Sequence, residues 1–201
     1  MHSPFAVVRS RRPSLPCAAS GSQISMIDAN PVQELQRVMT MLEVLYSDDQ
    51  LAVVNKPAGL MVHDSKLARG ETDFAADRLR EQFGKPIFLV HRLDRATSGC
   101  LLLAFDRDTA SALGKTLMSG EVGKEYLTVC RGWPQEIFTI DHALDGGPGK
   151  PVKKPAVTHF IRLATGELPV PSNGFETSRY ALLRCTLDTG RFRQIRRHLK
   201  H

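Results

Sequence analysis

HRLDRATSG, spanning residues 91 to 99, is a polar segment with two arginines and a carboxylate between two apolar runs. The runs, at 87 to 90 and 100 to 105, are short and bounded by Pro86 and Gly99, a pattern typical of buried strands. Polar residues that connect two buried strands are held on a rigid frame, where catalytic groups are commonly found. We therefore expect this segment to lie at a functional site.

Asp94 lies between Arg92 and Arg95 in this segment. Neighbouring guanidinium groups favour the ionised form of a carboxylate, so Asp94 is expected to be charged and able to act as a nucleophile or a base. An ordinary turn, capped by the side chains of Asp94, Thr97 and Ser98, accounts for the same composition equally well. Both interpretations stay open on these residues alone.

The segment, followed by its apolar strand, resembles the signature of the RluA-type pseudouridine synthases, whose motif aspartate is the catalytic residue. Asp94 occupies that position. The resemblance also implies that Arg92 and Arg95 bind the substrate, with Arg95 entering the space that the target base vacates. Protein kinases carry a related loop, but theirs places an asparagine five residues after the aspartate, where this chain has Gly99. No glycine-rich phosphate loop precedes the segment, so the kinase interpretation is rejected.

Two shorter segments resemble other motifs of this family. NKPAG at 55 to 59 is expected to be a strand that ends in a rigid turn lining the site, with Lys56 as a solvated turn residue. KEY at 124 to 126 supplies Tyr126. The resemblance implies that this tyrosine stacks on the target base, an interaction worth ~1–3 kcal/mol, and that its hydroxyl takes part in proton transfer.

GRFRQIRRHL, at residues 190 to 199, resembles a further motif of the family. The resemblance implies that Arg196 pairs with Asp94 and that Ile195 packs on the uracil. Such a pairing has a physical reason, since an unpaired buried carboxylate is costly and takes up a proton instead. Arg193 stands where the family often has a histidine.

The rest of the pattern predicts an α+β fold, with a single pseudouridine synthase catalytic domain on a largely antiparallel or mixed sheet flanked by helices. Strands are predicted at 42–46, 50–54, 125–130, 157–163 and 180–187, the first two as a hairpin. Helices are predicted at 72–83, capped by Thr72 and stopped by Gly84, at 107–117, interrupted by Gly114, and in the basic segment from Gly190.

The first 41 residues differ from the remainder. The first 27 contain no acidic residue, are rich in Ser, Ala and Pro, and show no apolar periodicity, so residues 1 to 41 are expected to be a disordered basic extension. An organellar targeting peptide, an RNA-binding arm and a start codon placed too far upstream are all compatible with this composition. The catalytic domain is expected over 42 to 201, and it is expected to be incomplete because relatives continue past the last helix.

The chain has 27 Lys and Arg against 21 Asp and Glu, a net charge of +6, which favours a polyanionic partner. No apolar stretch approaches the ~18 residues of a membrane span, and no Cys or His spacing suits zinc, so neither a membrane nor a metal is expected. The four isolated cysteines fit reduced thiols in a cytoplasmic protein. The expected phosphate contacts are Arg191, Arg193, Arg197, Lys200, Lys153 and Lys154.

Together these features lead to one functional hypothesis, the isomerisation of a uridine to pseudouridine in structured RNA without any cofactor. Motifs at 41–46, 131–133 and 155–160 most resemble tRNA-modifying members of the family, which implies tRNA, and uridine 65, as the target. The protein is expected to be a monomer. A catalytically silent RNA-binding protein, an inactive fragment and a synthase that acts on ribosomal RNA are the alternatives. Whether Asp94 acts as nucleophile or base stays open.

Overall fold

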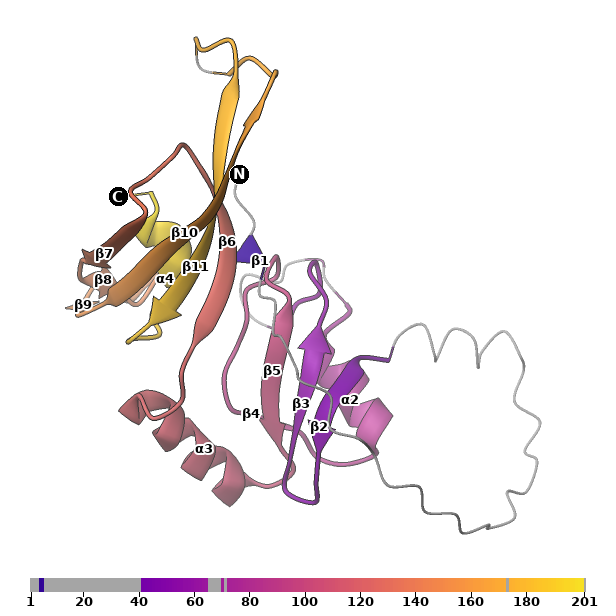
Figure 1. The fold of residues 1–201 in the computed structure, drawn as a ribbon. Coiled ribbons are helices and arrows are strands. Elements are labelled where there is room, and N and C mark those ends of the chain that lie inside the picture. The colour runs from indigo at the N-terminus through magenta and orange to yellow at the C-terminus, as the bar shows by residue number, and fades with distance from the viewer. Residues whose placement is uncertain (1–3, 6–40, 65–69, 71, 173, 201) are drawn as a thin grey trace, which may run out of the picture.

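The computed structural model describes residues 4–5, 41–64, 70, 72–172 and 174–200. Two sheets form its frame, a five-stranded one in the order β1-β6-β11-β10-β7 and a four-stranded one in the order β2-β3-β5-β4 (Figure 1). All of these strand pairs are antiparallel, and few helices accompany them. The predicted α+β class is therefore confirmed. No helix in the described part of the chain is long and apolar enough to cross a membrane.

The four-stranded sheet begins with the predicted hairpin, formed by β2 (Glu43–Ser47) and β3 (Leu51–Lys56). Its turn is held by Asp48, whose Oδ1 accepts hydrogen bonds of 2.8 Å from the backbone N–H groups of Gln50 and Leu51. Aspartate favours such turns because its short side chain reaches the backbone just ahead of it. The sheet is completed by β5 (Gly99–Ala104) and by β4 (Phe88–Leu89), which is shorter than predicted.

Helix α2 (Ala75–Phe83) covers this sheet and contributes Ala75 and Leu79 to its core. The helix ends at Gly84, in the left-handed region at φ 61°, as predicted. The predicted cap at Thr72 is wrong, because the N-cap residue is Phe74 and no side chain caps the first turn. The backbone N–H groups of Ala75 and Ala76 instead donate to the carbonyls of residues 61 and 62.

Helix α3 (Arg107–Ser119) follows β5 and begins at Asp106, whose Oδ1 accepts a hydrogen bond of 2.8 Å from the N–H of Thr109. The predicted interruption at Gly114 is wrong, since the helix continues through it to Gly120. A single glycine costs a helix only about 1 kcal/mol relative to alanine, which the surrounding turns and the cap offset.

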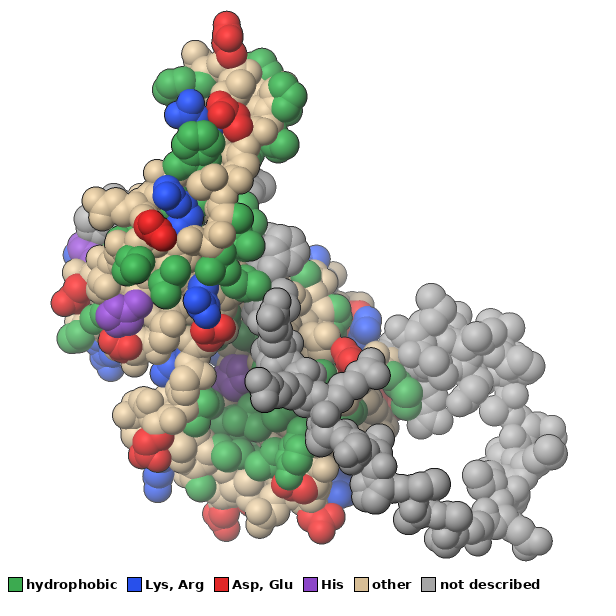
Figure 2. Space-filling view, viewed as in Figure 1, with side chains coloured by type: hydrophobic (Ala, Val, Ile, Leu, Met, Phe, Trp, Pro, Cys, Tyr) green, Lys and Arg blue, Asp and Glu red, His purple; other side chains and the backbone are tan. Residues whose placement is uncertain are grey.

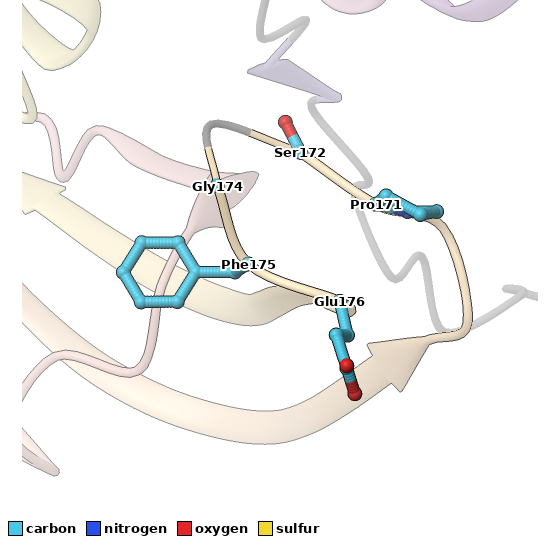
Figure 3. Close-up of a pocket in the computed structure, with 5 residues that line it drawn as sticks. All are labelled: Pro171, Ser172, Gly174, Phe175 and Glu176. Carbon is cyan, nitrogen blue, oxygen red and sulfur yellow. The ribbon is translucent and has the colours of Figure 1, made fainter.

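The five-stranded sheet consists of β6 (Glu125–Arg131), β11 (Ser178–Leu187), β10 (Val157–Leu168), β7 (Ile137–Asp141) and β1 (Pro4–Phe5). The β10–β11 hairpin is longer than predicted and projects beyond the sheet as a narrow arm (Figure 2). Its residues 163 to 170 are exposed, so no burial on one face imposes the alternating pattern that marks a strand in sequence. A shallow hollow at its tip is lined by Pro171, Ser172, Gly174, Phe175 and Glu176 and contains none of the predicted site residues (Figure 3).

The expected disorder of residues 1 to 41 falls almost wholly outside the described residues. The exceptions are Met41 and β1, which pairs with Leu127 and Thr128 of β6. Near the C-terminus, the short strands β8 (Leu144–Asp145) and β9 (Lys153–Lys154) form an additional hairpin. Helix α4 (Gln194–His198) is shorter than the helix expected from Gly190.

The two sheets have separate buried clusters that share one partly buried side chain. The cluster of the four-stranded sheet includes Val54, Leu101 and Leu103, and that of the five-stranded sheet includes Phe160 and Leu183. Tyr126 packs against both clusters. The junction of the sheets is thus built around a residue that the sequence singled out.

Candidate active site

Asp94 lies in the loop between β4 and β5, which leads into Gly99 of β5, opposite Lys56 of β3. Leu93 and Thr97 anchor this loop because both side chains are buried, while Asp94 itself is half-buried. The turn is closed by the backbone, with the N–H of Thr97 donating 3.0 Å to the carbonyl of Asp94. Within the described part of the chain, this turn is held by the backbone bond and not by the Asp94 side chain.

Lys56, at the end of β3, is fully buried, so the expectation of a solvated lysine is wrong. Its Nζ donates hydrogen bonds of 2.8 Å to the carbonyl of Pro57, 2.7 Å to that of Leu60 and 3.3 Å to that of Arg95. These acceptors match the three donors of an ammonium group. Burial lowers the pKa of Lys56 to about 8, and the nearby Asp94 carboxylate acts in the opposite direction.

The turn after Lys56 is bonded directly to the loop that carries Asp94. The N–H of Gly59 donates 2.8 Å to the carbonyl of Arg95, and Nε of Arg95 donates 3.0 Å to the carbonyl of Gly59. Gly59 has φ 90°, a conformation that L-residues rarely adopt. Segments 36 residues apart in sequence are thereby joined into one rigid unit, which places the NKPAG turn beside the Asp94 loop as expected.

Tyr126 reaches the site from β6 of the other sheet, where it stands opposite Cys185. Burial raises the pKa of Tyr126, and the Asp94 carboxylate and the ionised form of Cys100 raise it further. Tyr126 also packs against the cluster that includes Leu93, the residue before Asp94, although the two residues belong to different sheets. A raised pKa keeps the phenol protonated at neutral pH, so its hydroxyl can donate a hydrogen bond.

Ile195 and Arg196 come to the site from α4. Ile195 is buried in the same cluster against which Tyr126 packs. Arg196 is half-buried, and its buried Nε has no hydrogen-bond partner among the residues that the structure describes. Among the described residues no ion pair joins Arg196 to Asp94, so this pairing stays a prediction. Because an unpaired buried donor costs about 1–3 kcal/mol, an acceptor that reached this nitrogen would bind favourably.

Two histidines near the loop were not singled out from the sequence. Nε2 of His91 accepts a hydrogen bond of 3.1 Å from the N–H of Leu102, and burial lowers the pKa of His91. A neutral His91 therefore ties the start of the loop to β5. Nε2 of His63 lies 3.3 Å from Nη1 of Arg92, an exposed residue. No spacing rule in the sequence indicates either contact, since both join segments brought together only by the sheet.

A family model described as RNA pseudouridylate synthase matches residues 50 to 201, which include Lys56, Asp94, Tyr126 and α4. The chain belongs to the RNA pseudouridylate synthase family. This result confirms the resemblance on which the sequence analysis relied.

Proteins named tRNA pseudouridine synthase C are similar to most of this chain. The protein from Pectobacterium carotovorum subsp. carotovorum is 39% identical over 202 residues, covering 96% of this chain and 53% of that protein. The protein from Yersinia pestis is 40% identical over 170 residues, covering 80% of this chain and 66% of that protein. The chain thus spans between about half and two thirds of the length of these relatives.

Two solved structures share the fold of this pseudouridylate synthase chain. Human RNA Pseudouridylate Synthase Domain Containing 1 superposes with a TM-score of 0.61 at 24% identity, over 79% of this chain and 64% of that one. Human RNA Pseudouridylate Synthase Domain Containing 4 superposes with a TM-score of 0.62 at 24% identity, over 84% of this chain and 68% of that one. At 24% identity, these similarities show a shared fold.

The predicted phosphate-binding residues of this pseudouridylate synthase chain fall into two groups. Arg191 and Arg197 are engaged within the protein, Arg191 with the carbonyl of Pro155 at 3.0 Å and Arg197 with Oδ2 of Asp145 at 2.9 Å. The side chains of the second group are exposed: Arg193, Lys200, Lys153 and Lys154. The described residues contain no cluster of three His, Cys, Asp or Glu side chains that could hold a metal ion.

Proposed function

We propose that this chain converts a uridine of structured RNA to pseudouridine. The reaction breaks the bond between ribose C1′ and N1 of uracil, and it forms a bond between C1′ and C5. The hydrogen on C5 leaves as a proton and N1 gains one, so atoms balance without a redox cofactor. The observation that carries this proposal is that Tyr126 packs against two clusters, one that includes Leu93, next to Asp94, and one that includes Ile195.

Each residue then has a distinct task. The target uridine is extruded from its stack, at a cost of a few kcal/mol, because the enzyme cannot act on it inside the duplex. The Tyr126 ring and Ile195 hold the flipped uracil, and Asp94 acts on the sugar as nucleophile or base. Arg92 and Arg95 lie in the same loop as Asp94, where they bind the surrounding RNA. Arg196 supplies positive charge to Asp94 once substrate closes the site.

Transfer RNA is the proposed substrate, with uridine 65 as its target, because the relatives named above are tRNA pseudouridine synthases. The net charge of +6 supports a polyanionic partner. The exposed group of cations offers phosphate contacts along β9 and at α4. We further propose that residues 42 to 201 form the catalytic domain, that it acts as a monomer, and that it works in the cytoplasm.

The loss of the C5 hydrogen provides the test. A tRNA transcript labelled with tritium at C5 of uracil should release tritium into water when incubated with the chain, in proportion to the pseudouridine formed. Asp94→Asn is the matched control, because it keeps the shape of the side chain and removes the reactive carboxylate. No release by the parent chain from tRNA or ribosomal RNA would refute the activity. Release from ribosomal RNA alone would refute only the choice of tRNA.

A further inference from the structure

Helix α4 carries Ile195 and Arg196, yet it has little stability of its own. It contains five residues, and a helix this short is not stable in isolation. Its N-cap residue, Arg193, is left-handed at φ 49° and forms no side-chain cap. The position of α4 must therefore come from contacts with the rest of the protein.

The amide of Gln194 is buried and makes every hydrogen bond available to it. Nε2 donates 2.9 Å to the carbonyl of Val157 and 2.9 Å to Oγ1 of Thr158. Oε1 accepts 2.9 Å from the hydroxyl of Thr189 and 2.9 Å from the N–H of Arg191. The backbone N–H of Arg191 can only donate, so the orientation of the amide is determined.

His198 continues this chain of hydrogen bonds. Its Nε2 lies 3.0 Å from the carbonyl of His142, which can only accept, so Nε2 carries a proton. Nδ1 of His198 lies 2.8 Å from Oγ1 of Thr158. The same Oγ1 accepts a hydrogen bond from Nε2 of Gln194, so the hydroxyl links the two side chains of α4.

Gln194 and His198 are one helical turn apart, and both are bonded to the same hydroxyl of β10. Ile195 occupies a neighbouring face of α4 and belongs to the cluster against which Tyr126 packs. Any rotation of α4 that moved Ile195 away from Tyr126 would break the bonds to Thr158. We propose that the hydrogen bonds among Gln194, Thr158 and His198 position Ile195 in the base-binding part of the site. This role rests on the proposed function.

Substitutions at Thr158 separate this positioning role from general stability. Thr158→Val keeps the shape and removes the hydroxyl, leaving Nε2 of Gln194 and Nδ1 of His198 without the partner they share. Thr158→Ser restores the hydroxyl. Thr139→Val is the matched control, because the Thr139 hydroxyl also lies 2.9 Å from a histidine, His159, but on an exposed part of the same sheet.

Hydrogen exchange of α4 tests the proposal without reference to activity. The amides of Arg197 and Leu199 donate within the helix to the carbonyls of Arg193 and Ile195. In Thr158→Val they should exchange about tenfold faster or more, as expected when a buried hydrogen bond is lost, while β6 and β11 keep their protection. Thr158→Ser and Thr139→Val should match the parent. Unchanged exchange in Thr158→Val would overturn the proposal.

Single-turnover kinetics with tritium-labelled tRNA give the functional readout. Thr158→Val should lower the maximal rate per folded molecule by about tenfold or more, while its affinity for tRNA stays within about threefold because the exposed cations are intact. A parental rate per folded molecule would overturn the positioning role. If the parent chain itself forms no pseudouridine, the proposed function fails, and hydrogen exchange still decides whether the network positions α4.

Discussion

The Asp94 carboxylate attracts the buried ammonium group of Lys56, which donates a hydrogen bond of 3.3 Å to the carbonyl of Arg95, the residue after Asp94. The lysine thus stabilises the loop through its backbone and places a positive charge close to the carboxylate. This arrangement leads to the first prediction.

Replacing Lys56 should change how stability depends on pH. The pKa of Lys56 is about 8 in the folded protein, below its ordinary value of 10.5, so the unfolded chain binds more protons between these pH values. Stability of the parent should consequently rise from pH 8 to pH 10.5 relative to Lys56→Met. The full increase in the free energy of unfolding over this pH range is roughly 3 kcal/mol. Urea unfolding of both proteins at several pH values measures it, and parallel curves would contradict the buried ammonium.

Asp94→Asn should abolish pseudouridine formation and leave affinity for RNA within a few fold. The substitution removes the reactive oxygen without altering the size of the side chain, and the loop is closed by backbone rather than by this carboxylate. Tritium release and filter binding with the same tRNA give the two values. Turnover above a few per cent of the parent rate would rule out Asp94 as the catalytic group.

Tyr126→Ala should reduce turnover more than RNA binding, because stacking engages only the extruded base. Loss of a stacking interaction of ~1–3 kcal/mol corresponds to a decrease of about fivefold to 160-fold in kcat/KM. Tyr126→Phe keeps the aromatic ring and should therefore retain the stacking contribution. Unfolding measurements are needed alongside, because Tyr126 packs against both clusters. Weaker RNA binding with an unchanged maximal rate would argue against the stacking role.

The double substitution of Lys153 and Lys154 by glutamine should weaken the binding of all RNAs to the same extent. Both side chains are exposed on β9, and each phosphate contact contributes a little under one unit to the slope of log affinity against log salt. The slope should therefore become shallower by up to about two units. Arg197→Gln is the comparison, since its ion pair with Asp145 predicts a loss of stability. An unchanged salt slope in the double variant would exclude β9 from the interface.

Local patterns were sufficient to predict most elements of the fold. The β2–β3 hairpin, the stop of α2 at Gly84 and the strand before Arg131 depend on turn residues and apolar spacing within a few positions. The length of the β10–β11 hairpin and the continuity of α3 through Gly114 were not predictable in this way. The outer hairpin lacks a buried face, and the continuity of α3 depends on its cap and on neighbouring turns.

The sequence by itself determined which residues form the motifs, namely the Asp94 loop, Tyr126 and the segment of α4. Only the tertiary structure decided how they meet. It buried Lys56 against the Arg95 carbonyl, placed Tyr126 between two clusters and engaged Arg197 with Asp145. The physical reason is that burial and charge pairing depend on contacts between residues distant in sequence. A lysine in a turn is solvated or buried according to what the other strands place over it.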